Sequence, residues 1–143
     1  AEKNKCSDDL ICSSLLHDYG HFIIEDPNQL VSNLIDGNHE TIGANYLKKY
    51  FSKDIIEPIL LHVKAKKYLA RNRRYFDSLS KASKTSLKLQ GGIMSDIEAK
   101  KFKKNKNYKN AVKLRRFDEN AKKLNIKIKK IEDYQELLIS KII

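Results

Sequence analysis

The sequence predicts an all-α protein, and three observations lead to that fold class. Apolar residues recur at three- and four-residue intervals, whereas no segment keeps the strict alternation typical of a half-buried strand. Polar capping residues stand before several of these periodic segments. At 143 residues, 41% hydrophobic and 33% charged, the chain has the length and the balance of one globular domain with a buried core.

Three helices are predicted in the first half of the chain, over residues 10–24, 39–51 and 54–70. Ser7 with two following aspartates caps the first of them, and Asp26-Pro27 is expected to end it. The polar loop at 36–38 precedes the second helix. Ser52 caps the third, in which Pro58 lies early, where a helix tolerates proline best.

Four helices are predicted in the second half. They begin at residues 80, 95, 107 and 131, and the last two extend to about 124 and 142. Ser80 starts a short helix that stops at Gly91-Gly92. The pattern Ser95-x-x-Glu98 is a capping box that opens the next one.

Composition narrows the function classes. The net charge of +11 would suit a nucleic-acid partner, but only five of the 29 basic residues are arginine, and aromatic residues are few. We therefore keep nucleic-acid binding as a minority interpretation and expect solvated lysine faces that attract an anionic substrate.

Charged residues interrupt every apolar stretch, so no membrane span is expected. Cys6 and Cys12 form neither a metal-type pair nor a disulfide framework, which favours the cytoplasm.

The candidate chemistry is concentrated in four histidines. His17-Asp18 followed by His21 is predicted to place two imidazoles and a carboxylate along one side of one helix, because positions four apart share a face. His39 opens the next predicted helix. A single histidine is usually structural, but this repeated context favours a metal site. Imidazole nitrogens with a carboxylate that can bridge suit iron or manganese better than calcium.

Two further positions support a buried site. His62 falls on an inward-facing stripe of its predicted helix, in register with Ile55, Ile59 and Lys66. Asp118 lies in the middle of a predicted helix, where an unpaired buried carboxylate would be costly. A bound metal would relieve that cost.

The segment LLHDYGH at residues 15–21 resembles the LLHDIGH signature of HD-domain proteins. Four more segments add to the likeness in order: HETIGA at 39–44, HVKAKKYL at 62–69, LSKASKTSLKLQGGIM at 79–94 and LRRFDENAK at 114–122. Taken together, the chain resembles the phosphonate-catabolic branch of the HD superfamily, from its first residue to about Lys122. The resemblance implies an all-α helical bundle of the HD type.

The resemblance also implies roles for ten side chains. Asp18 would bridge two metal ions. His17 and Asp118 would bind one ion, and His39 and His62 would bind the other. The substrate's phosphonate would be surrounded by His21, Lys66, Ser83, Ser86 and Gln90. A lysine one turn after a metal-bound histidine is consistent with this, since it sets a cation beside the metal, and serine hydroxyls supply further donors.

The reaction that the resemblance implies is oxidation by dioxygen at a mixed-valent pair of iron ions, Fe(II) and Fe(III). The substrate would be a 1-hydroxylated phosphonate, such as 2-amino-1-hydroxyethylphosphonate. Carbon–phosphorus cleavage would release phosphate and a carboxylic acid. Manganese or another divalent metal is the alternative cofactor.

Two other functions stay open. In an HD phosphohydrolase the same ligands would activate water to attack a small phosphate ester or nucleotide, and the metal's identity would discriminate between the two reactions. A degenerate, non-enzymatic binding domain is the third hypothesis. Enzymes of this branch carry a metal-binding histidine on an earlier helix, whereas this chain has no histidine before His17. We therefore expect residues 1–143 to form a single HD-type domain that lacks its N-terminal helix.

Overall fold

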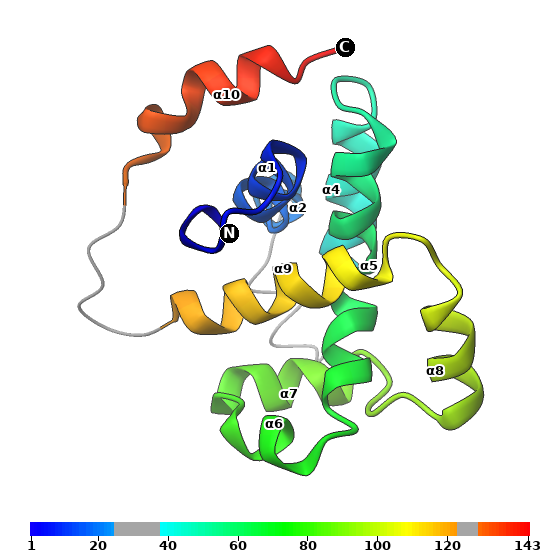
Figure 1. Cartoon of the computed structure of the whole chain (residues 1–143). Helices are drawn as coiled ribbons and strands as arrows, with labels where there is room; N and C mark the ends of the chain where they lie inside the picture. The colour runs from blue at the N-terminus through cyan, green and yellow to red at the C-terminus, as the bar shows by residue number, and fades with distance from the viewer. Residues whose placement is uncertain (25–37, 123–128) are drawn as a thin grey trace.

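The computed structural model describes residues 1–24, 38–122 and 129–143 (Figure 1). Helices and turns account for nearly all of the described residues, and no strand occurs among them. Phe51 and Ile142 form an isolated antiparallel bridge. The all-α prediction is confirmed.

The central element is α5 (Lys53–Leu69), which packs against α1, α4 and α9. Figure 1 shows α9 crossing α5, with α6 and α7 gathered near the carboxyl end of α5. The buried residues of α5 include Ile55, Ile59, His62 and Lys66, as the predicted inward stripe requires. Pro58 is also buried within the helix. The hydroxyl of Ser13, on α1, donates to the carbonyl of Ile55 at 2.8 Å and ties the two helices together.

The predicted helix over 10–24 is wrong, because the chain forms two helices with a bend between them. The first is α1 (Asp8–Leu16) and the second is α2 (Gly20–Ile23). Tight i→i+3 bonds carry the chain through the bend, from Tyr19 N to Leu16 O and from His21 N to Asp18 O, both at 3.0 Å. His17 and Asp18 therefore project from a turn, and His17 and His21 do not share one face of a continuous helix. The helix end predicted at Asp26-Pro27 lies outside the described residues.

Helix α4 (His39–Leu47) begins where the sequence predicts and ends four residues earlier. The amides of Tyr50 and Phe51 both bond to the carbonyl of Leu47, and this turn leads Phe51 into its bridge with Ile142. Helices α2 and α4 pack closely through Gly20 and Gly43.

Most of the remaining helices lie where the sequence predicts them. The single helix predicted over 131–142 is wrong, because residues 131–134 form a 3₁₀ turn and only residues 135–140 form an α-helix. The end predicted near residue 124 for the helix that begins at 107 lies outside the described residues. Helix α6 (Arg73–Ser78) was not predicted, and Asn72 caps it by accepting from the amide of Tyr75 at 3.1 Å. Gly91 and Gly92 end α7 with φ values of 88° and 75°, which glycine adopts readily. The capping box of Ser95 and Glu98 is present at the start of α8. The elements that follow α6 are α7 (Lys81–Leu89), α8 (Asp96–Lys103), α9 (Tyr108–Ala121), the 3₁₀ turn η2 (Ile131–Tyr134) and α10 (Gln135–Ser140).

Three apolar clusters stabilise this arrangement. The first joins α1, α4 and the start of α5, and Leu137 and Leu138 of α10 pack against it. The second joins the middle of α5 to α8 and α9, and the third holds the α6–α7 region against the end of α5. Among the described helices, none combines the length and the apolar composition that a membrane crossing requires.

Candidate metal centre

Five of the predicted site residues come together from four parts of the chain. His17 and Asp18 project from the bend between α1 and α2, His39 is the first residue of α4, His62 lies on α5 and Asp118 lies on α9. The contacts of α5 with α1, α4 and α9 bring these segments to one place. The centre is therefore a product of the tertiary packing and not of one local motif.

One group of candidate ligands consists of Asp18, His39 and His62. The two imidazoles meet through their Nε2 atoms, 3.1 Å apart. Oδ1 of Asp18 lies 3.5 Å from Nε2 of His39 and 3.8 Å from Nε2 of His62. Three ligand atoms thus face one another around a common point.

A second group consists of His17, Asp18 and Asp118. Nε2 of His17 lies 3.2 Å from Oδ2 of Asp18 and 3.8 Å from Oδ1 of Asp118. Asp18 belongs to both groups, with Oδ1 directed to one and Oδ2 to the other. A carboxylate placed in this way can bridge two ions.

The charge state of Asp18 suits that position. Burial acts to raise its pKa, but the close contact with His17 and the charges of the three surrounding histidines outweigh burial and hold the pKa below its ordinary value. His62 is shifted downwards, since burial and repulsion from His17 and His39 lower its pKa to about 3. The site therefore offers an ionised carboxylate and a neutral imidazole, which are the forms that bind metals.

Backbone carbonyls orient two of the imidazoles. Nδ1 of His62 lies 2.7 Å from the carbonyl oxygen of Ile59, and Nδ1 of His17 lies 2.9 Å from that of Ser14. Donation from Nδ1 to a carbonyl leaves the lone pair on Nε2, which faces the centre. Oε2 of Glu40 lies 3.7 Å from Nδ1 of His39, on the side away from the other ligands. This outer shell is the usual support of metal-bound histidines.

The donor set fits a transition metal. Two ligands about 2.1 Å from one ion and at right angles would lie about 3.0 Å apart, close to the separation of the two Nε2 atoms of His39 and His62. Nε2 of His17 is buried and makes no hydrogen bond with the described residues, which a metal would remedy. Imidazoles with carboxylates suit first-row transition ions.

Asp118 has a charged partner on its own helix in addition to its contact with His17. Oδ2 of Asp118 accepts a charge-assisted hydrogen bond from Nη1 of Arg115, three residues earlier on α9. Oδ1 faces His17 and lies 3.6 Å from Nζ of Lys122. The two oxygens are therefore divided between an arginine and the candidate metal centre.

The five predicted substrate-binding residues are less tightly grouped. Lys66 is buried, with 5% of its surface exposed, and it donates to the hydroxyl of Ser86 at 2.9 Å. Ser86 donates in turn to the carbonyl of Ser83 at 3.2 Å. His21 is exposed, and its ring stacks on that of His39 with centroids 4.0 Å apart. Gln90 lies at the end of α7, one turn beyond Ser86.

Sequence reasoning missed the polar residues around Ser83. Nζ of Lys122 lies 3.2 Å from the Ser83 hydroxyl and Nη2 of Arg115 lies 3.4 Å from it. Glu119 accepts from Nη2 of Arg115 at 2.5 Å. The spacing of Arg115 to Glu119, four residues on a helix, is a signal that could have revealed this pair. Tyr75, which accepts from Nε of Arg115 at 3.2 Å, has no comparable signal, because it is 40 residues away.

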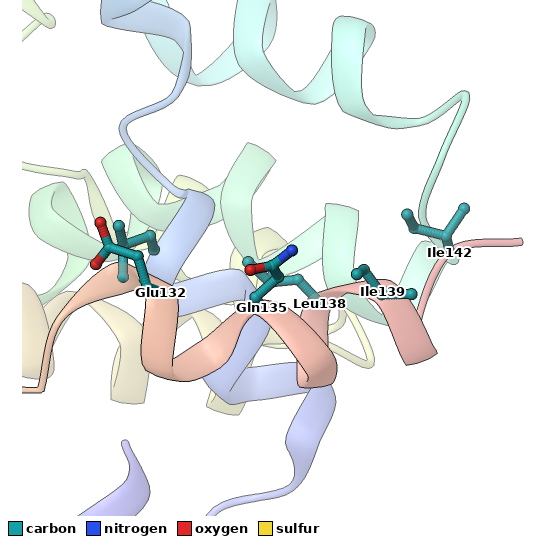
Figure 2. Close-up of a pocket in the computed structure, with 6 residues that line it drawn as sticks. Glu132, Gln135, Leu138, Ile139 and Ile142 are labelled. Atoms are coloured by element: carbon teal, nitrogen blue, oxygen red, sulfur yellow. The ribbon is translucent and has the colours of Figure 1, made fainter.

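A surface pocket of about 340 Å³ lies elsewhere, along the C-terminal segment. It is lined by Ile131, Glu132, Gln135, Leu138, Ile139 and Ile142 (Figure 2). None of the ten predicted site residues is among them, so the pocket has no part in the candidate centre.

Fold and site together define an all-helical protein with a cluster of histidine and aspartate side chains that could hold metal. The family comparison agrees, since the model of the HD domain matches residues 1–138. The chain belongs to the HD-domain family.

Three relatives extend the comparison. The hydroxymethylphosphonate dioxygenase of Gimesia maris is 44% identical over 126 residues, 87% of this chain and 63% of the relative. A dioxygenase of Leisingera caerulea, named for 1-hydroxy-2-(trimethylamino)ethylphosphonate and glycine-betaine-forming, is 39% identical over 88% of this chain and 65% of its own length. An uncharacterized protein of Acanthamoeba polyphaga mimivirus is 37% identical over 97% of this chain and 65% of its own. The chain thus spans slightly less than two thirds of the length of these relatives.

Proposed function

We propose that this chain carries the catalytic centre of an oxygenase that cleaves the carbon–phosphorus bond of a 1-hydroxylated phosphonate. The products are phosphate and a carboxylic acid, and dioxygen is the oxidant. We further propose that residues 1–143 form a single HD-type domain and that iron is its metal. Two relatives support the substrate class, because both are named as dioxygenases of phosphonates that bear a hydroxyl group.

The observation that carries the proposal is the shared position of Asp18. Its two oxygens face two different groups of ligands, His39 with His62 and His17 with Asp118. A single-metal site would not need a carboxylate between two sets of donors. Bound iron would supply the redox chemistry that activates dioxygen, which the side chains cannot perform themselves.

The protein's own residues hold the ligands in their reactive form. The carbonyls of Ile59 and Ser14 keep the Nε2 atoms of His62 and His17 free of protons. Arg115 occupies one oxygen of Asp118 and leaves the other facing the centre.

The phosphonate would bind beside the metals, at Lys66 and the serines of α7. Lys66 lies one turn after His62, it is buried, and its ammonium group donates to the hydroxyl of Ser86 at 2.9 Å, so a cation lies among polar side chains of α7. The hydroxyl of Ser83, which accepts from Lys122, is a further polar group on the same helix as Ser86. His21, stacked on His39, lies at the exposed side of the centre, and Gln90 completes the predicted set.

A reaction stoichiometry tests this function. The iron-loaded chain is incubated with hydroxymethylphosphonate or 2-amino-1-hydroxyethylphosphonate while dioxygen uptake and phosphate release are followed. One dioxygen consumed per phosphate released is the expected result. Phosphate release from phosphate esters without dioxygen uptake would instead identify a phosphohydrolase and refute the proposal.

A further inference from the structure

Arg115 has an unusual place for a charged side chain. It is 4% exposed, and its guanidinium is bonded from three sides. Nε donates to the Tyr75 hydroxyl at 3.2 Å, Nη2 donates to Glu119 at 2.5 Å, and Nη1 donates to Oδ2 of Asp118. A buried guanidinium needs such partners, because an unpaired charge in the interior is very costly.

The planar guanidinium turns these contacts into a geometric constraint. When the directions of Nε and Nη2 are set, that of Nη1 is set as well. Glu119 is on the same helix as Arg115 and could follow the arginine if its side chain moved. Tyr75 comes from α6, so its hydroxyl fixes the plane of the guanidinium with respect to a different part of the fold. The Tyr75 ring is itself held against the third apolar cluster.

The fixed atom, Nη1, determines how Asp118 presents its carboxylate. With Oδ2 held by Arg115, only Oδ1 faces Nε2 of His17, at 3.8 Å. Without that bond the carboxylate could rotate, and Lys122, 3.6 Å from Oδ1, would be free to draw it away from the centre. A chain of contacts therefore runs from Tyr75 through Arg115 to a candidate metal ligand.

We propose that Arg115 and Tyr75 are positioning residues for Asp118, and that they set the metal affinity of the group formed by His17, Asp18 and Asp118. This inference rests on the proposed two-metal function. Helix α6 contributes no candidate ligand, but through this inference it has a role at the site: the hydroxyl of Tyr75 orients Arg115, and Arg115 orients Asp118.

The test is calorimetric titration of the metal-free chain with Co²⁺, in which wild type is expected to bind two ions. Arg115→Lys keeps the positive charge but loses the planar guanidinium with its several N–H donors. It should weaken Co²⁺ binding at the group of His17, Asp18 and Asp118 by about 10–100-fold, the usual effect of removing an outer-shell partner. Tyr75→Phe keeps the ring packing and should weaken the same step by about 10-fold. The other step, at His39 and His62, should be unchanged in both variants.

Two matched controls and one double variant complete the design. Tyr134→Phe removes a hydroxyl bonded to Glu2, and Arg71→Lys alters an ion pair with Asp96; both should bind Co²⁺ as wild type does. In an Asp118→Asn background, Tyr75→Phe should have no further effect, because its target is already lost.

Three results would overturn the inference. Wild-type affinity in both Arg115→Lys and Tyr75→Phe would show that Asp118 needs no positioning. Equal weakening of both steps, with a lower Tm, would mean a general structural role. Binding of fewer than two ions by wild type would refute the two-metal function itself and this inference with it.

Discussion

The α-carbon of Gly20 lies against the backbone carbonyl of His39, so closely that a Cβ at position 20 would overlap the carbonyl oxygen. Gly43 makes the reciprocal approach, since a Cβ there would come within 2.8 Å of the amide nitrogen of Gly20. This contact joins the bend that carries His17 and Asp18 to the helix that begins with His39. The spacing of the two ligand groups therefore depends on a residue without a side chain.

Gly20→Ala should separate α2 from α4 and displace His39. The overlap is with backbone, so no side-chain rotation can relieve it, and a loss on the order of 3 kcal/mol in the free energy of unfolding is expected. Urea denaturation measures this loss, and metal analysis should show less metal at the His39 group. Asn45→Ala, an exposed change on α4, is the control and should behave as wild type. A stable Gly20→Ala chain with full metal content would refute the role of this contact.

Removing single ligands should separate the two metal positions. His62→Ala deletes a ligand of one group only, so one ion should be lost and the other retained. Asp18→Ala deletes the residue common to both groups, so both ions should be lost. Metal analysis of the purified variants checks this, and full occupancy in Asp18→Ala would show that the bridging assignment is wrong.

Lys66→Met should impair substrate binding and leave the metals in place. Loss of a charge-assisted contact to the phosphonate should raise KM about 10–100-fold, while metal content stays at the wild-type level. Lys64→Met, an exposed lysine on the same helix, is the matched control and should leave KM unchanged. Steady-state kinetics would contradict the assignment if Lys66→Met raised KM no more than Lys64→Met does.

The metal-free protein should lose stability in acid through His62. In the unfolded chain this imidazole is protonated below its ordinary pKa of 6.5, whereas burial and two neighbouring histidines lower the folded-state pKa to about 3. Between these values the unfolded state binds more protons, so the free energy of unfolding should rise with pH from about 3 to 6.5. Denaturation across that range checks the slope. His62→Gln should show a shallower slope than wild type, and an equal slope would refute the shift.

Local spacing predicted the parts of the fold and site that depend on one helix at a time. The inward position of His62 follows from its register with Ile55 and Ile59. The capping box at Ser95 follows directly from the sequence pattern Ser95-x-x-Glu98. The HD-family resemblance added the grouping of ligands from distant segments, and the family match confirms the resemblance itself.

Features that depend on contacts between helices could not be predicted. The apolar period continues through residues 17–19, so the sequence pattern does not indicate the bend at these residues. The close approach of Gly20 to His39 depends on the packing of α2 against α4, which periodicity does not describe. Helix α6 is short and largely polar, with no buried residue, and periodicity does not detect it. The Arg115 partner of Asp118 was visible at helical spacing, whereas Tyr75 reaches Arg115 only through the tertiary fold.

The central claim is that Asp18 joins two metal ions in one centre, and magnetic coupling tests it most directly. Two ions that share a bridging carboxylate interact, whereas isolated ions do not. The chain should be loaded anaerobically with iron, partly oxidised, and examined by EPR together with metal analysis. About two irons per chain with an exchange-coupled Fe(II)/Fe(III) signal, altered by added hydroxylated phosphonate, is the predicted result. A single iron per chain, or two irons without coupling, would contradict the account.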